Sequence, residues 1–156
     1  MIQIQVKENK IYEMKPNYSL GEFVFDTSIQ RYLNHKKYTV IINEDSIVGT
    51  MYEFIEPKIS VFIDNRNLIE SVTCDYKCYL YGKNIINLNI DYVIKEIIKT
   101  DPDLVETLWT FYKDKEVQER VYDFNCLGAQ IWVYRNKIVT VVCSNLDDTT
   151  GPARCA

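Results

Sequence analysis

Two stretches of the chain share one pattern of hydrophobic and polar positions. The first covers residues 51–74 and the second covers residues 121–143. In each stretch apolar residues alternate with polar ones, as is typical of strands with one buried face. Polar turn residues interrupt both stretches, and both end on an apolar run closed by a cysteine. Repetition of this kind predicts two copies of one structural unit.

A short helix is predicted upstream of each repeated stretch. Ile29, Tyr32 and Leu33 share one helical face at spacings of three and four. A longer apolar face of the same kind covers residues 90–98. Asn87 or Asn89 can cap this second helix, because the side-chain oxygen of an asparagine accepts hydrogen bonds from the free amides of the first turn.

Extended patterns follow both predicted helices. The predicted fold is therefore α+β, with two tandem units that each combine a helix with a four-stranded antiparallel meander, at about residues 20–74 and 81–143. An N-terminal hairpin over residues 2–14 precedes the two units. The units together form a single globular domain, residues 1–144, and the polar tail of residues 145–156 is predicted to be disordered.

One segment, residues 104–112, is open to two interpretations. Pro102 could occupy the first position of a helix, where its missing N–H costs nothing. The alternation of large side chains, and the extended pattern at the matching place in the first unit, favour a strand. That strand would end at a hairpin tip formed by Lys115 and Glu116.

Composition and charge narrow the class of protein. The chain has 156 residues, of which 47% are hydrophobic, which is enough for the core of one domain. Its net charge of −4 is opposite to the basic face expected of a nucleic-acid-binding protein. No apolar run approaches the ~20 residues of a membrane-spanning helix, and no secretory signal is visible. We therefore predict a cytoplasmic protein that binds neither nucleic acid nor membrane.

No catalytic or metal-binding motif is visible in the sequence. The only histidine, His35, lies beside two lysines and has no nucleophile near it in sequence. Cys74 and Cys78 have the spacing of two zinc ligands, but a zinc site would need two more. Serine-nucleophile, phosphate-loop and dinucleotide motifs are absent. The prediction is a protein without catalytic residues, metal or cofactor, and therefore not an enzyme.

The most informative stretch for function covers residues 101–123. It holds seven acidic and three basic residues, so its balance of −4 equals the net charge of the whole chain. One interpretation is a solvated hairpin over an aromatic core. The other is an acidic surface with aromatic anchors for a basic partner. The predicted partner-binding residues are Trp109, Tyr112, Asp114, Glu116, Glu119, Tyr122 and Asp123.

The chain resembles, in style and not through a specific motif, the immunity proteins of bacterial contact-dependent inhibition and related polymorphic toxin systems. The resemblance is carried by the block from Val121 to Cys143 and by the segments LGEFVFDTSI and YGKNIINLNID. It covers most of residues 20–143. It implies a cytoplasmic protein that binds and neutralises one cognate toxin domain, often a cationic nuclease.

Two other functions remain open from the sequence. A small-molecule or lipid-binding module would use an aromatic sheet face, with Tyr52, Trp132 and Tyr134 around a void. A structural subunit of a larger assembly is the third possibility. A toxin gene beside this one would favour the immunity interpretation. The sequence specifies neither the toxin and its activity nor the stoichiometry of binding.

Overall fold

The computed structural model of the chain describes residues 9–42 and 49–146. Among these residues, 49% lie in strands and 12% in helices. The protein is therefore mostly β, and the predicted α+β fold of two helix-plus-meander units is wrong. The difference lies in the helices, because only one helix, nine residues long, is present in the described part of the chain.

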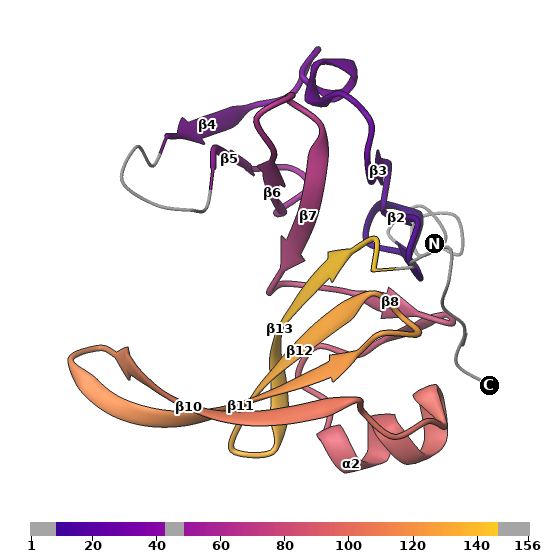
Figure 1. Ribbon diagram of the computed structural model, residues 1–156, viewed down its shortest axis with the longest axis vertical. Coiled ribbons are helices and arrows are strands. Elements are labelled where there is room, and N and C mark those ends of the chain that lie inside the picture. Colours follow the sequence, from indigo (N-terminus) through magenta and orange to yellow (C-terminus); the bar gives the residue numbers. More distant parts are fainter. Residues whose placement is uncertain (1–8, 43–48, 147–156) are drawn as a thin grey trace, which may run out of the picture.

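An eight-stranded antiparallel sheet forms the body of the protein (Figure 1). Its spatial order is β10-β11-β12-β13-β7-β6-β5-β4, so two meanders of four consecutive strands meet where β13 pairs with β7. Strands β4 and β10 are the two edges. The strands are β4 (Tyr38–Ile41), β5 (Met51–Phe54), β6 (Ser60–Ile63), β7 (Ile69–Cys74), β10 (Leu104–Tyr112), β11 (Lys115–Phe124), β12 (Ala129–Tyr134) and β13 (Lys137–Ser144).

The core crosses the junction between the two meanders without a break. Val141 lies opposite Cys74 and Cys143 lies opposite Val72 in the β7–β13 register. All four side chains are buried. Residues that lie directly opposite in an antiparallel pair point to the same face of the sheet, so these four define its core face.

Short elements cover the core face. They include a small three-stranded sheet of β1 (Met14–Lys15), β2 (Ser19–Leu20) and β3 (Phe23–Val24), and a hairpin of β8 (Tyr79–Leu80) and β9 (Lys83–Asn84). Leu20, Phe23 and Leu80 have no exposed surface.

The single helix consists of α2 (Ile90–Tyr92) and a wider π-helical continuation, η2 (Val93–Ile98). Asn89, one of the two predicted candidates, caps it: its side-chain oxygen accepts hydrogen bonds from the backbone N–H groups of Asp91 and Tyr92 at 2.9 and 3.3 Å. Its buried face contains Ile90, Val93, Ile97 and Ile98.

The first predicted helix is a single 3₁₀ turn, η1 (Ile29–Tyr32). Ser28 caps this turn by accepting a hydrogen bond from the N–H of Gln30 at 3.3 Å. Ile29 is its only buried residue. Nucleating a helix is costly, and burial of an apolar face must compensate for that cost. One buried side chain offers too little, so the segment does not extend to a helix.

The predicted N-terminal hairpin is also wrong where it can be compared. Its first strand falls within residues 1–8, which lie outside the described part of the chain. Residues 9–11 form a helical turn, and β1 pairs with β2 instead.

At the C-terminal end, residues 147–156 of the predicted tail also lie outside the described part of the chain. The backbone N–H of Leu146 donates a hydrogen bond to Asn17 Oδ1 at 2.9 Å.

Residues 104–112 form strand β10, so the structure supports the strand interpretation of this segment. The hairpin tip lies two residues earlier than expected, at Lys113 and Asp114, with φ angles of 51° and 65°. A two-residue turn with both φ angles positive matches the right-handed twist of the strands that it joins. Tyr112 and Lys115 are therefore the last pair before the turn.

Candidate functional site

Strands β10 and β11 form a long two-stranded hairpin that extends beyond the rest of the sheet (Figure 1). Nine residue pairs join the two strands. β12 pairs with β11 only as far out as Arg120, which lies opposite Val133. We call the part of the hairpin beyond this point, residues 108–119, the arm. Pairing between β10 and β11 alone holds the arm together.

Two large rings are exposed on the arm. Trp109 is 64% exposed and Phe111 is 80% exposed. Residues two apart in a strand point to the same face, so these rings are neighbours. Gln118 and Glu116 lie opposite them on β11 and share that face. We call these four residues the aromatic face. Adjacent exposed rings with a polar margin are typical of a protein-interaction site.

The aromatic face is a continuation of the core face of the sheet. Tyr122 lies opposite Val105 on one side and opposite Ile131 on the other, and both Tyr122 and Ile131 are buried. Alternation places Val105, Trp109 and Phe111 on that same face. Val105 is already 45% exposed. This face therefore becomes more exposed to solvent with distance from the body of the sheet.

The predicted partner-binding residues divide between two faces and the core. Glu116 lies on the aromatic face and Asp114 lies in the turn at the tip. Glu119 lies on the opposite face, where its carboxylate accepts a hydrogen bond from the hydroxyl of Thr110 at 2.8 Å. Tyr122 is only 6% exposed, so it stabilises the core and offers no surface for an anchor.

The last two predicted residues are Asp123 and Tyr112. Asp123 is at the base of the hairpin, opposite Leu104, with its Oδ1 atom buried. Tyr112 pairs with Lys115 through the backbone, and its side chain lies outside the described part of the chain. The structure therefore brings Trp109 and Glu116 together and adds Phe111 and Gln118, which were not in the predicted set.

The acidic residues of the stretch 101–123 do not gather on one surface. Asp103 is at the base, where its Oδ2 accepts a hydrogen bond from the backbone N–H of Asn125 at 2.7 Å. The arm itself carries three acidic residues and two basic ones, a balance of −1. Exposed aromatic area, more than charge, distinguishes the arm from its surroundings.

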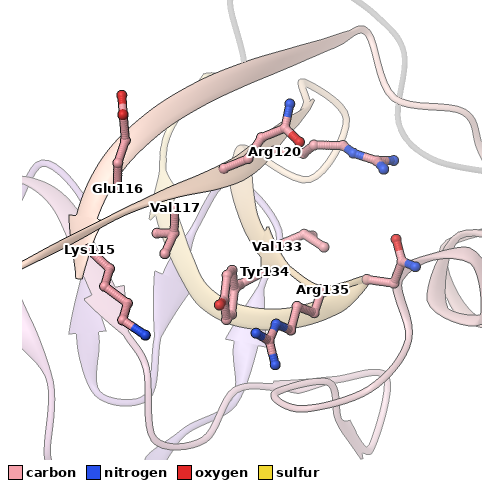
Figure 2. A pocket seen from close by; sticks show the side chains of 9 residues that line it. Lys115, Glu116, Val117, Arg120, Val133, Tyr134 and Arg135 are labelled. Carbon is pink, nitrogen blue, oxygen red and sulfur yellow. The ribbon is translucent and has the colours of Figure 1, made fainter. Parts of the chain in front are cut away.

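A cleft of about 490 Å³ lies beside the arm, between β11 and the turn that joins β12 to β13 (Figure 2). We call it the notch. Figure 2 shows the side chains of Lys115 and Arg135 on the same side of the strands as the ring of Tyr134. The lining residues are Lys115, Glu116, Val117, Gln118, Arg120, Val133, Tyr134, Arg135 and Asn136.

Sequence reasoning missed the notch. In the sequence, Lys115 and Arg120 were considered only for their effect on the net charge of residues 101–123. The signal in the sequence is the polar pair Arg135 and Asn136. It forms a second tight turn, whose φ angles of 51° and 65° match those at the hairpin tip. That turn ends β12 early and leaves the cleft beside β11.

Three of the five cysteines form part of the core. Cys74, Cys78 and Cys143 are all buried, and Cys143 Sγ lies 3.3 Å from Met14 Sδ. A hydrogen bond with Cys143 and burial raise the pKa of the Cys74 thiol, so it stays protonated at neutral pH. His35 lies apart from them, exposed in a turn. Among residues 9–42 and 49–146, no three histidine, cysteine or acidic side chains are placed to hold a metal.

The three rings proposed for a ligand pocket do not surround one void. Tyr52 lies opposite Val61, which has no exposed surface, so this tyrosine belongs to the core face. Its ring centroid is 5.6 Å from that of Tyr38. Ile131 and Val133 are buried on the core face. Trp132 lies between them in β12, so its side chain points to the opposite face of the sheet.

Comparison with known proteins identifies no family for this chain. No protein-family model, no curated protein and no solved structure matches the chain. In the described part of the chain, no helix is long and apolar enough to cross a membrane. The function is therefore inferred from the geometry of the arm and its surroundings.

The exposed rings should contribute little to stability. Trp109→Ala and Phe111→Ala are expected to change the free energy of unfolding by less than about 1 kcal/mol, because both rings are already in solvent. Tyr122→Ala is the comparison and should cost about 3 kcal/mol through the cavity it leaves. Urea denaturation followed by circular dichroism measures all three. A loss for Trp109→Ala as large as that for Tyr122→Ala would mean that Trp109 packs into the core.

Proposed function

We propose that this chain is a non-enzymatic immunity protein that binds and neutralises a cognate bacterial toxin domain. The observation that carries the proposal is the adjacent pair of exposed rings, Trp109 and Phe111, on the projecting arm. The resemblance to immunity proteins supports the class of partner. In this proposal the protein acts in the cytoplasm, and the toxin presents a basic surface, as a nuclease domain often does.

The two rings can supply a large share of a binding energy. An aromatic side chain buries about 150–250 Å² when it is fully covered. With exposed fractions of 64% and 80%, covering Trp109 and Phe111 is worth roughly 5–9 kcal/mol before the costs of association are subtracted. Interfaces concentrate their energy in a few aromatic and arginine side chains of this kind. The pair is thus the expected hot spot of the interface.

The arm presents these rings in a fixed arrangement. The nine-pair register and the tight turn at Lys113 and Asp114 define the hairpin backbone. The hydrogen bond between Thr110 and Glu119 links the two strands on the opposite face. Little backbone entropy remains to be lost when a partner binds, and preorganisation of this kind favours affinity. The partner would complete the cover that the core face lacks beyond Tyr122.

Charge has a secondary role in the proposed interface. The chain carries −4 overall, and a protein of this charge attracts a basic partner at long range. Glu116 lies opposite Phe111 and so stands at the margin of the aromatic face. Charges at such a margin affect the association rate more than the final affinity.

Protection from the toxin tests the proposal directly. The product of the gene beside this one is expressed from an inducible promoter as the candidate toxin, and growth is compared with and without the chain. The double variant Trp109→Ala, Phe111→Ala should lose protection, since each truncated hot-spot ring costs about 2 kcal/mol or more, roughly thirtyfold in affinity. Tyr18→Ala is the matched control, because Tyr18 is 56% exposed on another element. Full protection by the double variant would remove the arm from the interface.

The two faces of the arm should differ in their response to charge reversal. Glu116→Lys should slow association with the toxin domain at low salt, and added salt should reduce the difference. Glu119→Lys places the same charge on the opposite face and should have the smaller effect. Surface plasmon resonance at two salt concentrations measures both rates. An equal loss in the two variants would show that the aromatic face is not the side that meets the partner.

A further inference from the structure

Strand β11 has an open edge beside the notch. β12 pairs with β11 from Arg120 to Phe124, and then turns back at Arg135 and Asn136. Residues 115–119 of β11 therefore pair with β10 on one side and have the notch on the other. This open length of about 16 Å is room for one more short strand, in line with β12.

The backbone of the open edge is oriented for strand pairing. The two-residue turn makes Tyr112 and Lys115 a hydrogen-bonded pair. Hydrogen-bonding direction alternates along an antiparallel strand, so the next odd-numbered residues of β11 bond to β10. The N–H and C=O groups of Glu116 and Gln118 then point into the notch, in phase with those of Arg120, which meet β12.

The notch carries positive charge within an acidic protein. Lys115, Arg120 and Arg135 line it together with one carboxylate, that of Glu116. This gives the lining a balance of +2, whereas the whole chain carries −4. The guanidinium of Arg135 lies 5.2 Å from the centroid of the Tyr134 ring, a cation–π contact that steadies it beside the cleft.

We propose that the notch binds an extended acidic peptide segment, which adds to β11 as a strand and places a carboxylate between Lys115 and Arg135. Strand addition takes its affinity from backbone hydrogen bonds and its specificity from side-chain sites along the groove. Arginine is well suited to carboxylate recognition, because its planar fork can donate two parallel hydrogen bonds. The volume of about 490 Å³ lies within the usual range of ligand sites, about 300–1,000 Å³.

This site adjoins the proposed toxin interface and shares Glu116 and Gln118 with it, but the two sites use different chemical groups. The aromatic face offers apolar area and a carboxylate margin to a basic protein. The notch offers an unpaired backbone edge and cations to an acidic segment. Substitution of Trp109 and Phe111 leaves the notch lining unchanged, and Arg135→Glu leaves the aromatic face unchanged, so the two proposals can fail separately.

The probe for this site is a synthetic ten-residue peptide that alternates threonine with valine and carries two central glutamates, with both termini blocked. A matched peptide carries glutamine at the same two positions. Each is titrated into the full-length ¹⁵N-labelled chain, and amide hydrogen exchange is followed by NMR. The glutamate peptide should bind at least about tenfold more tightly than the glutamine peptide, as expected for a charge-assisted contact. Exchange at the amides of Glu116 and Gln118 should slow on binding.

Two variants assign the effect to the notch. Arg135→Glu should remove the preference for the glutamate peptide, while Lys95→Glu, an exposed cation on the helix, should leave it intact. N-methylation of alternate peptide residues should abolish binding, because it blocks one edge of the added strand.

Several results would overturn the proposal. Equal binding of both peptides would refute the acidic ligand, and protection of β10 amides in place of Glu116 and Gln118 would refute the site. An absence of binding at millimolar peptide would refute both. If the chain sediments as a dimer that Arg135→Glu dissociates, the occupant is a second copy and not a separate acidic segment.

Discussion

Four residue pairs between β7 and β13, residues 71–74 against 141–144, join two four-stranded meanders into one sheet. Their inward side chains are small apolar residues and cysteines, all buried, so the sheet stays closely packed where its halves meet. This pairing fixes the position of one meander relative to the other. The order of the sheet therefore places β4 at one edge and the β10–β11 hairpin at the other.

The hairpin changes character along its length because its support changes. Near the body, β11 is flanked by β12 and its Tyr122 and Phe124 are buried. Beyond Arg120 the same face continues outward without a cover and carries Trp109 and Phe111. The early turn of β12 creates the arm and also opens the notch. A single feature of the topology thus produces both an apolar surface and a basic cleft with an unpaired strand edge.

Periodicity in the sequence predicted much of the sheet but less of what lies around it. Alternation identified residues 104–112 as a strand, because alternation is a property of the backbone itself. The helical spacing at Ile29 was misleading, since spacing does not show how much of a face will be buried. Tyr122 was predicted to be an anchor, because alternation does not show how far the elements that cover the core face extend. The notch depends on the relative lengths of β11 and β12, which residue patterns do not specify.

We propose that a partner covers Trp109 and Phe111 when the protein functions. Replacing Trp132 with phenylalanine leaves Trp109 as the only tryptophan, and removes an indole N–H that is buried without a hydrogen-bond partner among the described residues. Acrylamide quenching of Trp109 fluorescence is then measured in the free protein and in its complex with the proposed toxin partner. We expect strong quenching in the free protein and a large decrease in the complex. A complex that forms while quenching stays unchanged would show that the partner does not cover Trp109.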